Sequence, residues 1–150
     1  MRVVVQRVTQ ASVEIDKKVK GKIDLGLLVL AGFTPDDTDD DIKWVASKVV
    51  NMRIFGDAED KMNLSVQNVQ GNLLIISQFT LFANTKKGNR PSYINAAPPA
   101  VAIPLYEQFI RYLELAMGKP VQTGEFGADM KVSLLNDGPV TIVIDSKNKE

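Results

Sequence analysis

The sequence NLLIISQFTLFA, residues 72–83, decides the fold because it is the strongest β-strand signal in the chain. Its second half carries three hydrogen-bonding side chains, Ser77, Gln78 and Thr80. With the two-residue period of a strand, Ser77 and Phe79 are expected on one face, and Gln78 and Thr80 on the other. Burying such groups unpaired costs about 1–3 kcal/mol each, so a central strand would accept them only where it ends at a pocket, which is one interpretation of this segment. The alternative is a strand that emerges into solvent, with Thr80 present for its β propensity.

Further strands are predicted on both sides of this segment. Residues 26–32 (GLLVLAG) form a short apolar run bounded by glycines, which is typical of a strand buried on both faces. The other predicted strands cover residues 2–9, 12–15, 19–24, 121–126, 130–135 and 140–145. The last two are joined by Asn136-Asp137-Gly138-Pro139, and Asp-Gly predicts a hairpin turn there.

Two helices are predicted between the strands. The first follows N-cap candidates at residues 37–39, and its apolar residues recur with helical spacing: Ile42, Val45, Ala46, Val49 and Val50. The second is expected to have Pro104 in its first turn and to stop at Gly118 and Pro120. Its inner face is predicted to hold Leu105, Phe109, Tyr112, Leu113 and Ala116.

This order of elements predicts one mixed α+β domain. We expect a curved, mostly antiparallel, barrel-like sheet with two main helices over residues 1–146, and a polar tail over residues 147–150. A chain of 150 residues can bury a proper core. No signal peptide or membrane-spanning run is evident, so a cytoplasmic protein without a membrane partner is expected.

The composition restricts the chemistry. The chain has no histidine and no cysteine, which excludes Ser-His-Asp triads, thiolate zinc sites and cysteine nucleophiles. Catalysis must use hydroxyls, carboxylates, lysines, backbone groups or the substrate itself. We expect neither a metal nor a cofactor, and we interpret the acidic stretch at residues 34–41 as a helix start on a solvated face. The 18 basic and 18 acidic residues cancel, which disfavours broad nucleic-acid binding but still permits a local basic patch.

Residues 84–99 form a long loop that is a candidate for such a patch. Lys86, Lys87 and Arg90 lie within five residues of one another, beside Tyr93. Cations of this kind bind nucleic-acid phosphates, and an aromatic ring can stack on a base. The alternative is a solvated basic loop without a partner.

Gly138 and Pro139 also allow two interpretations. They can belong to a simple hairpin turn, with Pro139 opening the next strand. Alternatively, Gly-Pro is a candidate cis peptide, which would project two consecutive carbonyls in the same sense.

Several motifs, in this order along the chain, together resemble the D-aminoacyl-tRNA deacylase family. They are Gln6-Arg7-Val8, Ala11-Ser12-Val13, Ser77-Gln78-Phe79-Thr80-Leu81, Gly88-Asn89-Arg90-Pro91-Ser92, Ala128-Asp129-Met130 and Asn136-Asp137-Gly138-Pro139-Val140-Thr141. The resemblance runs from Met1 to about Ser146, and the SQFT and NxGPVT motifs are both intact. It implies hydrolysis of the ester of D-aminoacyl-tRNA, which is chiral proofreading in translation. It also implies a homodimer with one active site at each subunit boundary, and no DNA partner is expected.

The resemblance further implies roles for individual residues. Ser77, Gln78, Phe79 and Thr80 would form the catalytic pocket, with Met130 near its wall. Gly138-Pro139, in cis and from the other subunit, would exclude L-amino acids, and Arg7 would help to hold this pair. Lys86, Lys87 and Arg90 would contact the tRNA. Glycyl-tRNA should be accepted, because glycine has no side chain to clash.

The mechanism expected from these residues is orientation with oxyanion stabilisation, since an aminoacyl ester is already activated. A water would attack the carbonyl, the backbone amides around Phe79 and Thr80 would stabilise the oxyanion, and the ribose 2′-OH would orient the water. Thr80 as a covalent nucleophile is the rival, although no base is evident for it. Two other readings stay open, a non-catalytic nucleic-acid-binding dimer and an esterase for small esters.

Overall fold

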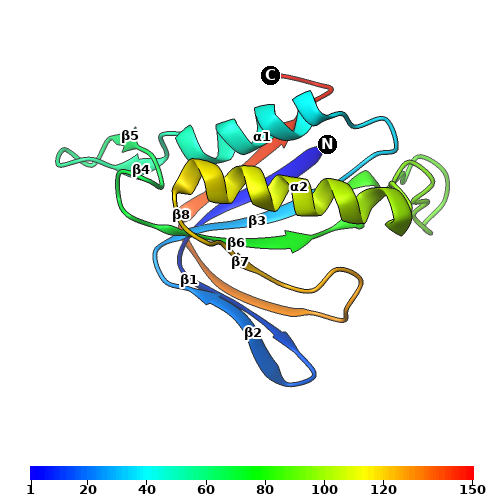
Figure 1. Cartoon of the computed structure of the whole chain (residues 1–150), viewed down its shortest axis with the longest axis horizontal. Coiled ribbons are helices and arrows are strands. Elements are labelled where there is room, and N and C mark those ends of the chain that lie inside the picture. Colours follow the sequence, from blue (N-terminus) through cyan, green and yellow to red (C-terminus); the bar gives the residue numbers. More distant parts are fainter.

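Two α-helices and a six-stranded mixed sheet form the fold in the computed structural model, which describes residues 1–150. The strands are β1 (Arg2–Ile15), β2 (Lys18–Ile23), β3 (Gly26–Gly32), β4 (Phe55–Gly56), β5 (Met62–Leu64), β6 (Asn72–Ser77), β7 (Gln122–Thr123) and β8 (Lys131–Asp145). The helices are α1 (Asp39–Asn51), the 3₁₀ helix η1 (Phe79–Phe82) and α2 (Pro99–Met117). Figure 1 shows α1 and α2 side by side over one face of the sheet. No helix is both long and apolar enough to cross a membrane.

The sheet has the order β2-β1-β3-β6-β7, and β8 also pairs with β1. The three ladders of β1 are antiparallel, whereas β3–β6 and β6–β7 are parallel, so the predicted α+β class and mostly antiparallel sheet are confirmed. The sheet curls until β2 packs on β7. A Cβ atom on Gly21 of β2 would lie 2.9 Å from the carbonyl oxygen of Thr123. This contact nearly closes the sheet into a barrel.

The core lies between the sheet and the two helices. The five apolar residues predicted for the first helix are all buried in α1, and Thr38 caps it within a capping box completed by Asp41. β3 is almost completely buried, as predicted. Phe109 and Leu113 of α2 are fully buried, whereas the predicted Ala116 is exposed. α2 ends at Gly118 in a left-handed conformation, as predicted for a helix-stopping glycine.

The start of α2 differs from the prediction. The helix begins at Pro99, so Pro104 lies in its second turn rather than its first. Pro98 provides the N-cap position, and the early turn brings Ala102 into the core. The cost of Pro104 is limited because it removes only one intrahelical N–H, close to the helix start.

The strand that opens with Asn72 is shorter than predicted. β6 ends at Ser77, and the chain then turns into η1. The reason is the partner strand, since β3 ends at Gly32, one residue after Ala31, which pairs with Ser77. The predicted alternation of faces therefore does not extend to Phe79 and Thr80.

The hairpin predicted at residues 136–139 is wrong. β8 runs from Lys131 to Asp145 without reversing, and both of its halves pair with β1. β1 is itself one strand of 14 residues rather than the two predicted. A partner this long lets β8 continue, and two register shifts, between Gln6 and Val8 and between Val8 and Gln10, accommodate the extra residues as bulges. Similarly, only Gln122–Thr123 of the predicted 121–126 strand joins the sheet.

Candidate active site

A cavity of about 270 Å³ opens where the parallel strands β3 and β6 end. Ala31 and Gly32 line it from β3, and Ser77 from β6. The carboxyl ends of parallel strands are a preferred place for ligand binding, because the chain diverges there. The segment from Phe126 to Val132 forms the opposite wall.

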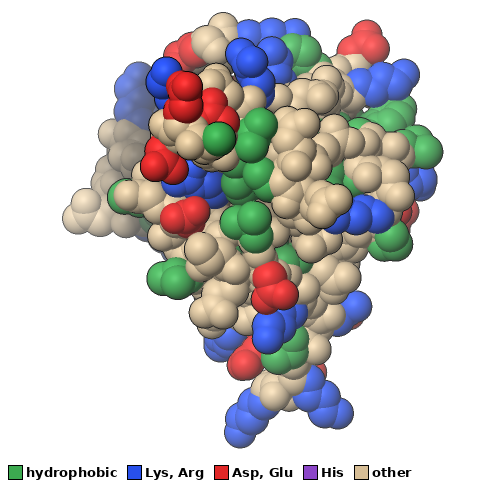
Figure 2. Space-filling view, turned by 90° about the vertical axis from the view of Figure 1, so that its left-hand side faces the viewer, with side chains coloured by type: hydrophobic (Ala, Val, Ile, Leu, Met, Phe, Trp, Pro, Cys, Tyr) green, Lys and Arg blue, Asp and Glu red, His purple; other side chains and the backbone are tan.

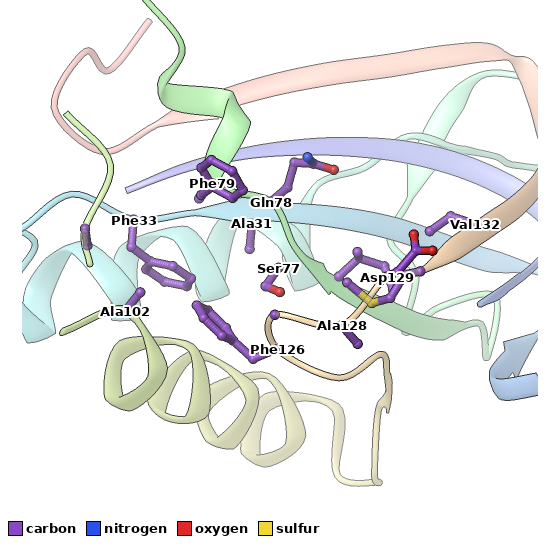
Figure 3. A pocket seen from close by; sticks show the side chains of 15 residues that line it. Ala31, Phe33, Ser77, Gln78, Phe79, Ala102, Phe126, Ala128, Asp129 and Val132 are labelled. Atoms are coloured by element: carbon purple, nitrogen blue, oxygen red, sulfur yellow. The ribbon is translucent and has the colours of Figure 1, made fainter. Parts of the chain in front are cut away.

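Aromatic rings form the inner wall of this cavity. Figure 3 shows Ser77 directed into the cavity toward the rings of Phe33 and Phe126. Tyr106 of α2 lies behind them and contacts both, at ring-centroid distances of 6.4 Å and 5.9 Å. Its hydroxyl donates to the carbonyl of Ile75 at 3.0 Å, and burial raises the pKa of this phenol far above its ordinary value. Tyr106 therefore supports the wall as a neutral group.

The residues of the SQFT motif take different positions. Ser77 and Gln78 line the cavity with Phe79, whose ring is 55% exposed and packs edge-on against Tyr93 at 5.1 Å. Thr80 does not line the cavity. Its hydroxyl accepts a hydrogen bond from the side-chain amide of Gln78.

The backbone at this point presents unpaired donors. The first N–H groups of a helical turn have no carbonyl partner within that turn. In η1 these are the amides of Phe79 and Thr80, and neither donates to a loop carbonyl or to a side chain. By contrast, the Gln78 amide donates to the carbonyl of Ala31 at 2.7 Å. Two free amides beside an apolar cavity can bind a developing oxyanion.

Met130 lies in the outer wall, where it packs against the smaller of the two core clusters. It fits closely over Gly124, because a Cβ atom there would collide with the Met130 sulfur. Asp129 is the only carboxylate among the lining residues, and its side chain is 85% exposed and paired with Lys131 at 2.9 Å. The cavity therefore contains no buried general base.

Gly138 and Pro139 occupy the bulged part of β8. Their peptide bond is cis, and both residues are exposed. Gly138 has φ +136°, a backbone conformation that only glycine adopts without strain. A Cβ atom there would lie 2.8 Å from Val140 and 3.1 Å from the Arg7 guanidinium. Asn136 braces the bulge by accepting the Val140 amide proton at 2.9 Å.

Arg7 holds this bulge from the neighbouring strand. Its Nε–H donates to the Asp137 carbonyl at 2.9 Å, and its Nη1–H donates to the Ile54 carbonyl at 2.6 Å. The Asp137 carboxylate lies 3.4 Å from the same Nε. The side chain of Arg7 is only 15% exposed, so the bulge has a largely buried anchor.

Within one chain, the bulge and the cavity are separate features. None of Arg7, Gly138 and Pro139 is among the residues that line the cavity. The structure thus brings Ser77, Gln78, Phe79 and Met130 together, but not Gly138, Pro139 or Arg7.

The predicted basic residues lie on the loop that follows η1. Lys86, Lys87 and Arg90 are exposed at the tip of a tight loop, which the backbone bridge between Asn84 and Ser92 closes. None of the three makes an ion pair within the chain. Because Tyr93 contacts Phe79, this loop begins at the rim of the cavity.

Sequence reasoning missed part of the site. Phe33, Phe126 and Ala102 line the cavity, yet they were not predicted as site residues. The parallel pairing of β3 with β6 places Ala31 opposite Ser77, so Phe33, two residues later, lies at the same end of the sheet, and this pairing links positions far apart in the chain. The available signal was the apolar 26–32 run itself, since the residue that follows a buried parallel strand often borders a site. No group of three or more acidic side chains is placed to hold a metal ion.

The comparisons with known proteins place this fold in a class of enzymes, the ester hydrolases that act on aminoacyl-tRNA. The chain belongs to the family described as D-Tyr-tRNA(Tyr) deacylase, whose model matches residues 4–145. It is 61% identical to the D-aminoacyl-tRNA deacylases of Flavobacterium psychrophilum and Bacteroides fragilis, over the full length of both chains in each case.

Solved structures agree with this fold. The chain matches the structure of a c-Myc DNA Unwinding Element Binding Protein with a TM-score of 0.90 at 37% identity, covering 97% of this chain and 98% of the other. A probable eukaryotic D-amino acid tRNA deacylase matches with a TM-score of 0.82 at 20% identity, over 95% and 97% of the two chains. The second likeness concerns the fold alone.

Proposed function

We propose that this chain hydrolyses the ester between a D-amino acid and the 3′-terminal adenosine of tRNA, releasing the free D-amino acid and tRNA. The observation that carries the proposal is the cavity at the end of β6, which Ser77, Gln78 and Phe79 line. The amides of Phe79 and Thr80, which follow directly, donate to no loop carbonyl and to no side chain. The full-length relatives named D-aminoacyl-tRNA deacylase support the same activity. Because its substrate is tRNA, we place the reaction in the cytoplasm.

The reaction needs no side-chain nucleophile. A water attacks the ester carbonyl, and the oxyanion lies against the N–H groups of Phe79 and Thr80. Collapse of the intermediate breaks the bond to the adenosine 3′-oxygen, which takes up a proton as it leaves. The neighbouring ribose 2′-OH orients the water. Neither histidine nor cysteine is present, and Asp129 is exposed, so the protein contributes position and hydrogen bonds rather than a base.

Selection against L-amino acids is assigned to Gly138 and Pro139 of a second copy. In this arrangement their carbonyls occupy the space that an L side chain would need, while a D side chain points outward. Rejection then depends on a clash rather than on an attractive contact. A wide range of D-amino acids should be accepted, and glycine, which has no side chain, should not be excluded.

A homodimer is the assembly that completes this site. Gly138 and Pro139 are exposed, although Arg7 and Asn136 hold them firmly, which suits a group that inserts into another molecule. The same strand exposes apolar side chains, with Leu135 55% and Val143 63% accessible. A broad groove of about 650 Å³ is lined in part by Val143 and Leu81. Covering this face with a second copy would remove apolar surface from water.

The loop with Lys86, Lys87 and Arg90 is proposed to contact tRNA phosphates near the bound 3′ end. Its three cations are free of ion pairs and lie beyond Phe79 and Tyr93 at the rim of the cavity. Phosphate contacts position a nucleic acid without reading its sequence. The loop would therefore hold different tRNAs equally well.

The decisive test is deacylation of D-tyrosyl-tRNA and L-tyrosyl-tRNA, side by side, at catalytic enzyme concentration. Loss of the D ester alone is expected. Loss of both esters would retain an esterase but overturn the exclusion by Gly138 and Pro139. Loss of neither would overturn the proposed activity.

The role of Thr80 has its own test. Thr80→Val removes the hydroxyl and keeps the shape, and we expect turnover within about threefold of wild type, because the backbone amide remains. A loss of a thousandfold or more, with an unchanged fold, would instead identify Thr80 as the nucleophile.

A non-catalytic nucleic-acid-binding dimer is the second candidate function. The observation that favours it is the basic loop from Lys86 to Arg90, whose cations make no ion pair, together with the likeness to the 37%-identical c-Myc DNA Unwinding Element Binding Protein. It predicts salt-dependent binding that survives substitution of Ser77 and Thr80, with no ester turnover.

A further inference from the structure

The hairpin of β1 and β2 carries a second concentration of positive charge, separate from the loop after η1. Residues 16–24 hold four lysines and two aspartates, a net charge of +2 in a chain whose charges cancel. The four lysines are all exposed, and none makes an ion pair: Lys17, Lys18, Lys20 and Lys22. Figure 1 shows the hairpin projecting from the body of the molecule, and Figure 2 shows basic side chains spreading from this lower tip.

The backbone at the tip makes the presence of a lysine there notable. Asp16 and Lys17 have φ +49° and +64°, and they connect Ile15 directly to Lys18 in a two-residue turn. Turns with positive φ at both central residues favour glycine at the second position, because a Cβ is crowded there. Lys17 nevertheless occupies this position, which sets an exposed positive charge at the tip of the hairpin.

The hairpin also lies close to the cavity. Val132, which lines the cavity, pairs with Val13, and the next pair joins Lys131 to Glu14. Lys17 follows Glu14 by three residues, or about 10 Å of extended chain. In Figure 1 the hairpin and the basic loop after η1 lie below and above the carboxyl end of β6. A polynucleotide whose 3′ end enters the cavity would therefore meet cations on both sides.

We propose that the β1–β2 hairpin binds the phosphate backbone of the tRNA acceptor arm while the 3′ end occupies the cavity. This inference rests on the proposed deacylase function and names a surface for its macromolecular partner. Ion-pair-free lysines suit phosphates, which they attract without reading sequence. The competing explanation is that lysines on an edge strand only prevent edge-to-edge pairing between molecules.

The test compares two double variants of equal charge change. Lys18→Gln/Lys20→Gln alters the hairpin, and Lys61→Gln/Arg111→Gln alters two exposed cations outside it, one beside β5 and one on α2. Each is assayed with D-tyrosyl-tRNA and with D-tyrosyl-adenosine, which carries the same ester without the tRNA body. We expect the hairpin variant to raise KM for the tRNA by roughly 10- to 50-fold at 0.1 M salt, with kcat unchanged. The slope of log affinity against log salt should fall by about 1.5.

The results with D-tyrosyl-adenosine and with the control variant show whether an effect is specific to the hairpin and to the tRNA body. The hairpin variant should hydrolyse D-tyrosyl-adenosine as wild type does, and the control variant should match wild type on both substrates. Unchanged KM and unchanged salt slope in the hairpin variant would overturn the proposal. Self-association of that variant without any change in its KM for the tRNA would also overturn the proposal, because the lysines would then only prevent edge-to-edge pairing between molecules.

Two readouts separate this proposal from the deacylase proposal. If wild-type protein cleaved neither substrate, the proposed function would fail. Binding of uncharged tRNA, measured in parallel, would still test whether the hairpin binds tRNA. Weaker binding by the hairpin variant than by wild type would support this proposal, and equal binding would overturn it.

Lys17→Gly gives a test that does not disturb folding. Glycine suits the positive φ, so the melting temperature should equal or exceed that of wild type. The KM for D-tyrosyl-tRNA should nevertheless rise, by several-fold for one lost phosphate contact. A variant with the tRNA KM of wild type would place Lys17 outside the contact.

Discussion

The carboxyl end of β6 and the bulge of β8 both interrupt regular strand pairing, but for opposite reasons. β6 stops because its partner β3 ends, and Ser77 then faces an enclosed cavity. β8 keeps its partner throughout, and two register shifts displace Gly138 and Pro139 to the surface. One interruption forms a recess and the other a projection. The difference teaches that the recess and the projection are separate features of one chain, because neither Gly138 nor Pro139 lines the recess.

The two regions are also held in different ways. The turn after Ser77 is braced at the surface, where Gln78 donates to Thr80 and Phe79 packs on Tyr93. The bulge is braced from within, by the largely buried Arg7. A projection that is pinned from below while its tip stays exposed can enter a second molecule with little further ordering.

The largest effect is expected at the tip of the projection. Gly138→Val places a side chain where even a Cβ atom would lie 2.8 Å from Val140, at a φ of +136°. The bulge must shift, and a displacement of about 1 Å at such a site costs on the order of 100-fold in turnover. Single-turnover deacylation of D-tyrosyl-tRNA measures this loss.

Gly56→Ala is the matched control for that substitution. Its new Cβ would have no neighbour closer than 3.8 Å, and Gly56 lies in the small β4–β5 sheet. Activity equal to wild type is expected. If Gly138→Val were as active as Gly56→Ala, the bulge would have no part in the reaction.

A smaller effect is expected when Arg7, the anchor of the bulge, is replaced while Gly138 and Pro139 are kept. Arg7→Met loses the hydrogen bonds to the carbonyls of Asp137 and Ile54 while filling a similar volume. We expect turnover to fall by about tenfold, since each lost bond to a charged donor is worth roughly 1.5–3 kcal/mol and only part of this acts on the bulge. Discrimination between D- and L-tyrosyl-tRNA, measured as the ratio of kcat/KM values, should fall as well. A variant with full discrimination would show that the bulge keeps its shape unaided.

Loss of the Tyr106 hydroxyl, which lies behind the wall of the recess, should have little effect on activity. Tyr106→Phe keeps the ring against Phe33 and Phe126 but removes the hydrogen bond to Ile75. We expect about 1 kcal/mol less stability in denaturant unfolding and turnover within about threefold. The buried Ile75 carbonyl still accepts from Gly124 at 3.2 Å, which limits the cost. A hundredfold loss of activity would give Tyr106 a part in the reaction itself.

The smallest effect concerns pH and a third region, the start of α1. Burial alone would raise the pKa of the Asp41 carboxyl, but hydrogen bonds from Lys147, Thr38 and Ser146 hold it well below its ordinary value. Such a group stabilises the fold above its unfolded pKa of about 3.9, and this stabilisation is lost as pH falls through the lower folded value. Asp41→Asn should therefore narrow the difference in melting temperature between pH 5 and pH 3 by about 2–4 °C. An unchanged difference in melting temperature would contradict the lowered pKa of Asp41. The activities of the recess and bulge variants should therefore be compared above pH 5, where this carboxylate is charged in both the folded and the unfolded state.

Sequence reasoning predicted the elements whose signals are local. The periodicity of α1 identified all five of its buried residues, because side-chain spacing on a helix depends on neighbouring positions alone. The α+β class and the buried β3 followed from similar patterns. The SQFT and NxGPVT motifs pointed to residues that line the recess or form the projection.

What failed depended on distant partners. Asp137-Gly138 predicts a turn locally, but the unbroken edge of β1 keeps β8 extended. Likewise, the end of β6 is set by the end of β3, some 45 residues earlier in the chain. Phe33 and Phe126 join the recess only through this parallel alignment and the return of the chain after β7. Pairings of this kind are properties of the folded sheet, which a single sequence does not display.

The most direct test of a site shared between two copies is complementation between two inactive variants. Ser77→Phe fills the recess, and Gly138→Val disrupts the projection; both should retain cooperative unfolding and lack deacylase activity. In a mixed dimer the intact recess of one subunit meets the intact projection of the other. Co-refolding equal amounts should therefore restore about one quarter of wild-type activity on D-tyrosyl-tRNA, since half of the dimers are mixed and each has one complete site. A mixture no more active than its separate components would contradict the shared site.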